Sequence, residues 1–401
     1  MVRILALGSN SGGQLATGDL DDVHYMKKSI FADPAAVDQK TSEMWCVHGG
    51  GNHVFAWSKD GTRLFASGSN AEGELGMGKK VSPSVLAWTP VEFPGDRVIQ
   101  VSCGWNHSVL LNDRGELFSA GSNDFGQLGT DSFGDKDGCW RPVLGPKDAS
   151  DKTQCCKFVA VACGLRHSLA VTEDGQVYGW GANRCGQLGI ASANKKASNV
   201  SRMVLVFEGL PPILLVACGR SHSLMLSRDR RTIFASGMDK HGQCGPSDHC
   251  QPVAGLWRKF ASPHPVLKLC SGWEFGAVLL ELLDQKQSTA GRIGAVAAWG
   301  RADHGQLAVP VQSDNKNYHR ELACIPDLDD ITDIACGSNH TVALRANGDI
   351  LMWGWNEHGN AGDPALKDVS RPLRISSNDH HDLDCPVLAI GCGYGNSFAV
   401  V

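Results

Sequence analysis

The chain has 401 residues, of which 42% are hydrophobic and 20% are charged, and its formal net charge at pH 7 is −5. This slightly acidic balance argues against nucleic acid or an anionic membrane as the default partner, because both attract basic surfaces. The first thirty residues lack a charged segment followed by a long apolar core, and no apolar run reaches the roughly 20 residues that span a bilayer. We therefore expect a soluble intracellular protein.

Two phrases recur along the whole chain, and each occurs seven times. The first, typified by GSNDFGQLGTD, begins at Gly8, Gly68, Gly121, Gly181, Gly237, Gly300 and Gly354. The second, typified by CGLRHSLAV, begins at residues 49, 103, 163, 218, 271, 336 and 392. Self-similarity at a spacing of 53 to 63 residues indicates a repeat architecture.

Within one unit the predicted elements follow a fixed order. An apolar run at 157–162 precedes the Cys-Gly phrase, a second run follows at 168–172, and the turn Asp174-Gly175 leads into a third run at 176–180. Short runs separated by Asp-Gly turns predict hairpin strands. Since one small sheet cannot bury both of its faces, the repeated units predict sheets arranged radially.

The two ends of the chain complement each other. Residues 2–6 match the third strand of a unit, and residues 398–401 match the second. We expect residues 2–8 to pair with residues 396–401, which removes free sheet edges. The predicted fold is all-β, a single domain over residues 1–401 that forms a seven-bladed β-propeller closed by its N- and C-terminal strands.

These phrases and units resemble the regulator-of-chromosome-condensation family of propellers. The start ALGSNSGGQL, the late phrase WGWNEHGN and the expected lack of a tail resemble most its fungal alpha-tubulin suppressors, also described as killer-toxin-insensitivity proteins. That resemblance implies a non-catalytic adaptor, cytoplasmic and nuclear, that forms a heterodimer with a small Cys-rich metal-binding electron carrier of the CSL zinc-finger type. It also implies roles in diphthamide synthesis on elongation factor 2 and, through the Elongator complex, in wobble-uridine modification of tRNA, without direct contact to nucleic acid or membrane.

Two other functions of the family are alternatives. The founding member is a guanine-nucleotide exchange factor for a Ran-type small GTPase and uses a protruding hairpin and a basic tail, whereas the extra residues 283–293 here predict a short loop without an apolar wedge. The plant UV-B receptor of the family uses a tryptophan cluster. Only Trp105 and Trp273 occupy the matching positions here, in blades that are not neighbours, which argues against light sensing.

Recurring histidines and cysteines favour a structural role. The histidine of the second phrase recurs as His53, His107, His167, His222 and His340, and we expect each to be buried and to tie its blade to a neighbouring backbone. The buried slot before the glycine holds Cys103, Cys163, Cys218, Cys336 and Cys392, where a small residue suits a crowded ring. Cys155, Cys156, Cys244 and Cys250 lie outside this pattern and are expected at the surface or in packing.

No chemical motif stands out. There is no Cys-x-x-Cys pair, no phosphate-binding glycine loop and no catalytic phrase. We therefore predict that the chain is not an enzyme, uses no cofactor and binds no metal by itself.

The strand order predicts where a partner binds. Because antiparallel strands alternate in direction, both phrases should lie on one face of the ring and the Asp-Gly turns on the other. Exposed Trp, Tyr and Arg often anchor protein interfaces, so Trp273 and Trp105 are expected as apolar anchors, unless Trp273 merely packs against Phe275. The predicted partner-binding residues are Trp105, Asn106, Arg166, Arg220, Trp273, Glu274, Asn339, Trp355, Glu357, His358 and Tyr394.

Overall fold

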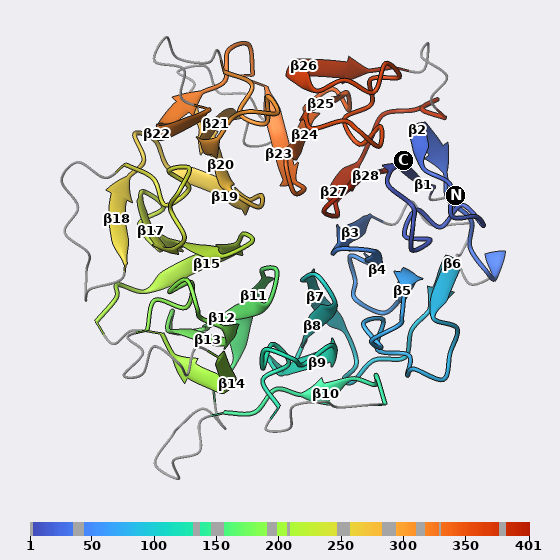
Figure 1. The fold of residues 1–401 in the computed structure, drawn as a ribbon, viewed down its shortest axis with the longest axis horizontal. Helices are drawn as coiled ribbons and strands as arrows, with labels where there is room; N and C mark the ends of the chain where they lie inside the picture. The colour runs from blue at the N-terminus through green and yellow to red at the C-terminus, as the bar shows by residue number, and fades with distance from the viewer. Residues whose placement is uncertain are drawn as a thin grey trace.

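The structure, a computed structural model, describes residues 3–34, 44–130, 137–145, 156–190, 199–206, 209–246, 257–282, 294–309, 317–328, 330–376 and 382–401. Within these ranges all the regular elements are β-strands, which confirms the all-β class (Figure 1). The described residues include no helix long and apolar enough to cross a membrane.

The strands form four-stranded units around a central channel (Figure 1). The inner strands are β3 (Trp45–Gly49), β7 (Val98–Cys103), β11 (Phe158–Cys163), β15 (Ile213–Cys218), β19 (Val266–Ser271), β23 (Ile331–Cys336) and β27 (Ala389–Cys392). The second strands are β4 (His53–Ser58), β8 (His107–Asn112), β12 (His167–Thr172), β16 (His222–Ser227), β20 (Phe275–Glu281), β24 (His340–Arg345) and β28 (Asn396–Val400). The third strands are β5 (Leu64–Ser69), β9 (Leu117–Gly121), β13 (Val177–Ala182), β17 (Thr232–Gly237), β21 (Gly294–Arg301), β25 (Ile350–Gly354) and β1 (Ile4–Gly8). The outer strands are β6 (Ser84–Pro90), β10 (Arg141–Pro142), β14 (Asn199–Leu205), β18 (Arg258–Ala261), β22 (Tyr318–Cys324), β26 (Val369–Ile375) and β2 (Val23–Lys28).

The units pair internally and scarcely with one another. Five of them are separate four-stranded sheets in the described part of the chain. The remaining strands, β19 to β26, form one sheet whose two halves are joined only by the pair Gly294↔Ile331. Each copy of the second phrase joins the inner strand of a unit to its second strand, as the repeat predicts.

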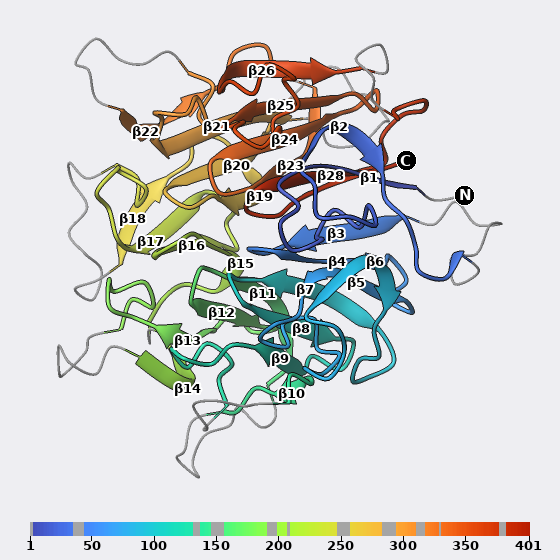
Figure 2. The ribbon, with the colours of Figure 1, turned by 45° about the vertical axis from the view of Figure 1, so that its right-hand side comes forward.

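The predicted closure of the ring is confirmed. Strand β1 pairs with β28 from Ile4↔Val400 to Gly8↔Asn396, and the backbone groups of Arg3 and Val401 exchange two hydrogen bonds of 2.9 Å. Figure 2 shows these two strands side by side in one blade. Val2, which was expected in the same strand, lies outside the described residues.

The hydrophobic core lies between neighbouring blades. Fully buried tryptophans on three third strands donate from Nε1 to the backbone oxygen of the glutamine in the first phrase of the preceding blade: Trp180 to Gln127 (2.8 Å), Trp299 to Gln243 (3.0 Å) and Trp353 to Gln306 (3.0 Å). The amide oxygen of the same glutamine accepts a backbone N–H of its own loop, at 2.8 Å in all three. The glutamine of the repeated Gly-Gln thus holds its own loop through its side chain and binds the tryptophan of the next blade through its backbone oxygen.

The repeated histidines lie at the junctions between blades. All five are buried, as predicted. Four rings hydrogen-bond through Nε2 to a serine hydroxyl of the next blade, where the sequence had suggested a backbone partner: His53 to Ser108 (2.8 Å), His107 to Ser168 (3.1 Å), His167 to Ser223 (2.9 Å) and His222 to Ser271 (3.1 Å). In the cysteine slot, Cys103, Cys163 and Cys392 are buried as predicted, whereas Cys218 and Cys336 are only half-buried.

Burial holds these imidazoles in the neutral form. It lowers the pKa of His53, His107 and His167 to about 3 and that of His222 and His340 to about 4. In the unfolded chain a histidine takes up a proton near pH 6.5. The unfolded state therefore binds more protons below that pH, and the free energy of unfolding falls as the pH drops from about 6.5 toward 4.

Replacing His340 by asparagine, the residue that the last repeat carries as Asn396, should reduce this acid sensitivity. With one titrating group removed, the slope of unfolding free energy against pH should fall by about 1 kcal/mol per pH unit between pH 4.5 and 6. Urea unfolding at several pH values measures the slope. His264→Asn, at a half-exposed position, is the control variant, and its slope should equal that of the parent chain. An unchanged slope in H340N would contradict the conclusion that buried, neutral His340 causes the acid sensitivity.

Candidate protein-binding surface

The strand register places both phrases at the same end of each blade. In the pairs His107↔Gly121, His167↔Gly181 and His340↔Gly354, the histidine of the second phrase lies opposite the first glycine of the first phrase. The residue after that glycine then donates its backbone N–H to the residue before the histidine, at 2.8 Å in each of these blades. Both phrases therefore share one face, as the alternation of strand direction predicts.

Backbone hydrogen bonds between blades fix the loops at the channel mouth. They run from Gly51 N to Gly104 O (3.2 Å), Trp105 N to Leu165 O (3.2 Å), Arg220 N to Trp273 O (3.0 Å), Trp273 N to Ser338 O (2.8 Å), Ser338 N to Tyr394 O (2.9 Å) and Tyr394 N to Gly50 O (2.9 Å). Because these bonds join the loops at six of the seven junctions, the side chains between glycine and histidine project from a rigid rim. Rigid side chains lose little conformational freedom when a partner binds.

Trp105, Trp273 and Tyr394 meet over the channel mouth and are called the aromatic cluster below. The ring centroids are 6.0 Å apart for Trp105 and Trp273, 5.9 Å for Trp105 and Tyr394, and 5.8 Å for Trp273 and Tyr394. Trp105 and Trp273 belong to blades that are not neighbours, as the sequence shows, yet their rings are in contact. Loops of non-adjacent blades converge at the narrow mouth, so long side chains reach across it. Trp273 packs on these two rings, whereas Phe275 fills the buried place that histidine takes in other blades.

Two arginines extend the aromatic cluster over the neighbouring blades. The Arg220 guanidinium carbon lies 5.3 Å from the ring centre of Trp273, and that of Arg166 lies 4.2 Å from the ring centre of Phe125. Both arginines are exposed, and neither has an ion-pair partner among the described residues. Stacking on a ring holds a guanidinium in place and leaves its edge free for hydrogen bonds. Phe125 was not among the predicted residues. The sequence could have indicated it, because it is an aromatic residue within the first phrase.

Three predicted contact residues support the rim from below. Glu274 is only 8% exposed, and its carboxylate accepts from Arg301 at 2.8 Å and lies 3.6 Å from His241. Asn339 is equally buried, and its backbone oxygen accepts from Trp355 N at 2.8 Å. Asn106 is half-buried, as Trp105 and Trp273 are. Little of the Glu274 and Asn339 side chains is therefore open to a partner.

The last group of predicted residues lies beside the aromatic cluster. Trp355 and His358 make an edge contact at 5.2 Å, and His358 Nδ1 lies 2.7 Å from Asp22 Oδ2. A Cβ added at Gly395, next to Tyr394, would approach a ring carbon of Trp355 to 4.0 Å, so Trp355 borders the cluster. Glu357 is exposed. These three residues therefore form one edge of the same face.

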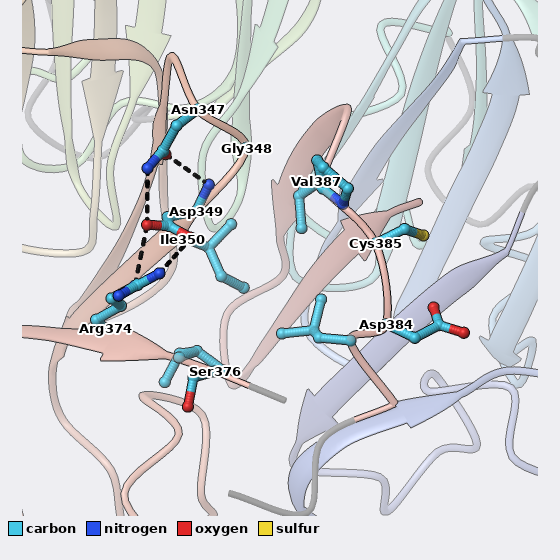
Figure 3. Close-up of a pocket in the computed structure, with 12 residues that line it drawn as sticks. Asn347, Gly348, Asp349, Ile350, Arg374, Ser376, Asp384, Cys385 and Val387 are labelled. Atoms are coloured by element: carbon cyan, nitrogen blue, oxygen red, sulfur yellow. Dashed lines mark hydrogen bonds and ion pairs between the residues drawn. The ribbon is translucent and has the colours of Figure 1, made fainter. Parts of the chain in front are cut away.

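Two cavities lie away from this rim, one inside the channel and one at the opposite end of a blade. One, of about 220 Å³, lies in the channel and is lined by inner-strand residues that include His48, Lys268, Cys270 and Cys336. The other, of about 230 Å³, lies beside the turn Asn347-Gly348, and Figure 3 shows Arg374 bonded to Asp349 at one rim, with Asp384 and Cys385 across from them. No group of three or more metal-ligating side chains occurs within the described ranges. Cys244 is buried in packing and Cys156 is half-buried, whereas Cys155, Cys250 and residues 283–293 lie outside the described residues.

Comparison with known proteins agrees with this architecture. The model of the RCC1-like domain matches residues 3–399. The secretion-regulating guanine nucleotide exchange factor of Bos taurus is 31% identical, over 99% of this chain and 82% of that protein. An RCC1 repeat-containing protein of Schizosaccharomyces pombe, C10F6.04, is 28% identical over 99% of this chain and 98% of its own length.

A solved structure shows the same fold. Prp20p of Saccharomyces cerevisiae superimposes with a TM-score of 0.79 at 21% identity, covering 100% of this chain and 91% of that one. Together with the seven paired phrases and the radial sheets, these matches establish the family: the chain is a member of the RCC1-like domain family of β-propellers.

Proposed function

We propose that this chain is a non-catalytic adaptor that binds a protein partner on the face carrying both phrases. The observation that carries the proposal is the aromatic cluster, flanked by Arg166 and Arg220. The scaffold does not require these residues, since other repeats have Leu165, Ser338 or Asn52 at the same loop positions. Aromatic rings and arginines on a rigid rim are typical of the centre of a protein interface.

The proposed partner is a small Cys-rich, metal-binding electron carrier with which the chain forms a heterodimer. This assignment is supported by the resemblance of the seven units and of the phrase WGWNEHGN to the fungal alpha-tubulin suppressors. The guanidinium groups of Arg166 and Arg220, which have no ion-pair partner in the part of the chain that the structure describes, suit acidic side chains beside an apolar contact. In this proposal the heterodimer acts in the cytoplasm and nucleus, in diphthamide synthesis and in Elongator-dependent modification of tRNA.

Nucleotide exchange on a small GTPase is the second candidate. It is favoured by the 31% identity, over 99% of this chain, to a protein named as a guanine nucleotide exchange factor. A GTPase would also need a rigid surface, so the face alone does not separate the two functions.

Two measurements on the purified full-length chain separate the candidates. Calorimetry against the metal-loaded electron carrier should show one-to-one binding, and a Ran-type GTPase loaded with a fluorescent nucleotide should release it no faster when the chain is added. If the chain accelerated nucleotide release and did not bind the electron carrier, the proposed adaptor function would be wrong and nucleotide exchange would take its place. A charge-reversed variant, Arg166→Glu with Arg220→Glu, should weaken carrier binding at least tenfold if these arginines contact its acidic groups.

A further inference from the structure

The cysteines of the repeat slot share one orientation. The thiol points across the blade junction to a backbone oxygen of the preceding inner strand: Cys103 to His48 O (3.5 Å), Cys163 to Ser102 O (3.4 Å) and Cys218 to Ala162 O (3.5 Å). In each case the residue faced is the one directly before the slot of the preceding blade. A slot cysteine therefore contacts whichever residue the preceding repeat has at that position.

The fifth repeat changes this position. It reads Cys270-Ser271 where its neighbours read Ala-Cys, so its cysteine is displaced by one residue toward the start of the strand. The next slot cysteine, Cys336, lies on the neighbouring inner strand, β23. Cys270 Sγ lies 3.5 Å from Ile334 O, two residues before Cys336 in that strand, and Cys336 Sγ lies 3.8 Å from Thr341 Oγ1. Both cysteines are half-buried and line the channel cavity.

A lysine stands beside the two thiols. Lys268 Nζ lies 2.5 Å from Asp333 Oδ1, and the two residues bridge the same pair of inner strands, β19 and β23. The Cys336 thiol and then the positive charge of Lys268 lower the pKa of the Cys270 thiol, although burial and Asp333 oppose them. The Cys270 thiol and burial raise the pKa of Cys336. Lys268 precedes Cys270 by two residues on β19 and lines the same cavity, so we assign Cys270 as the thiol that attacks first and Cys336 as the thiol that closes the disulfide.

We propose that Cys270 and Cys336 form a thiol-oxidation site in the channel, at which a hydroperoxide converts them into a disulfide between β19 and β23. The Cys270 thiolate attacks one oxygen of the peroxide and the O–O bond breaks. When the peroxide is hydrogen peroxide, the products are a sulfenic acid on Cys270 and one water. Cys336 then attacks that sulfur, loses its proton, and displaces the hydroxyl as a second water. Two thiols are oxidised and one peroxide is reduced to two waters, so the step balances without a further reductant.

The slot cysteines of earlier blades lack these features. Cys103, Cys163 and Cys218 each face a carbonyl oxygen, as Cys270 does, but no lysine is among the charges that act on their pKa. Burial raises the pKa of all three, to about 12 for Cys163. They should react with peroxide far more slowly than Cys270, because the thiolate is the nucleophile.

Peptide mapping of the full-length chain tests the site. After brief treatment with hydrogen peroxide and blocking of free thiols with N-ethylmaleimide, digestion with trypsin and Asp-N gives peptides 269–283 and 333–345, each with one cysteine. Mass spectrometry should find them linked, and linked before the other thiols react. Folded protein without this linkage, or oxidation of Cys163 at the same rate, would overturn the proposal.

Variants assign the roles of the residues. Cys270→Ser should abolish the linkage, whereas the matched variant Cys163→Ser should leave its rate unchanged. Lys268→Met should slow the linkage at least threefold at pH 7, and Lys268→Arg, which keeps the charge, should restore it. Equal rates in the Met and Arg variants would remove the lysine from the proposal, and linkage in C270S through another thiol would refute the pair.

Discussion

Replacing Gly164 by alanine should destabilise the chain by about 3 kcal/mol, at the upper end of what overpacking costs. A Cβ at this position would lie 2.2 Å from His167 Cε1 and 2.5 Å from Gly219 O of the next blade. Neither atom belongs to a flexible side-chain end, because the ring is fixed by Ser223 and the carbonyl belongs to the next loop. The added methyl group must therefore push two blades apart. Urea unfolding followed by tryptophan fluorescence measures the loss.

Gly186→Ala is the control for the backbone conformation of glycine. Its φ is +77°, but a Cβ added there would meet nothing within 4 Å, so only the cost of the left-handed conformation remains, about 1 kcal/mol. If both variants lost the same stability, the glycine of the second phrase would not be required by the close approach of the blades.

The scaffold was largely predictable because its residues recur. Seven copies of two phrases indicate the strand order, the closure between β1 and β28 follows from the two incomplete units, and the shared face follows from antiparallel pairing. The burial of the histidines follows from their recurrence as well. Their serine partners were less visible, because the contacts join residues 49 to 61 positions apart and Ser271 supplies its contact from a different strand position.

The candidate surface was predictable in place but not in geometry. The sequence puts Trp105 and Trp273 in separate blades and gives no width for the channel, so their contact at 6.0 Å could not be inferred. From the sequence alone, Glu274 is expected to be available to a partner, because nothing in the phrase shows that Arg301 binds its carboxylate. The position of Cys270 beside the strand that carries Cys336 depends on both a one-residue displacement and the direction of its thiol, and only the first is visible in the sequence.

The features that set this chain apart occur where a repeat departs from its own pattern. Trp273 and Glu274 lie in the fifth repeat, which also has Phe275 for histidine and the displaced Cys270. Since the shared residues already satisfy the junctions of the ring, such departures need another explanation, and binding is the one that their position at the channel mouth supports. Trp273 is therefore the residue with the most decisive variant.

Trp273→Ala should weaken binding of the proposed electron-carrier partner by about 2 kcal/mol, roughly thirtyfold in Kd. The substitution removes the ring that contacts Trp105, Tyr394 and Arg220, so it deletes an anchor and frees the guanidinium at once. Because the rings touch, the further loss in the Trp105/Trp273 double alanine variant should be smaller than the sum of the two single losses.

Calorimetry of the single and double variants measures the loss, and the unfolding midpoint of each variant should stay near that of the parent, since Trp273 is half-exposed. Leu388→Ala is the matched control: Leu388 is 47% exposed and precedes β27 at the end of the blade away from the phrases, so partner binding should not change. An unchanged affinity in the double variant would place the interface away from the aromatic cluster. A loss in L388A of the same size would place it on the face of the Asp-Gly turns.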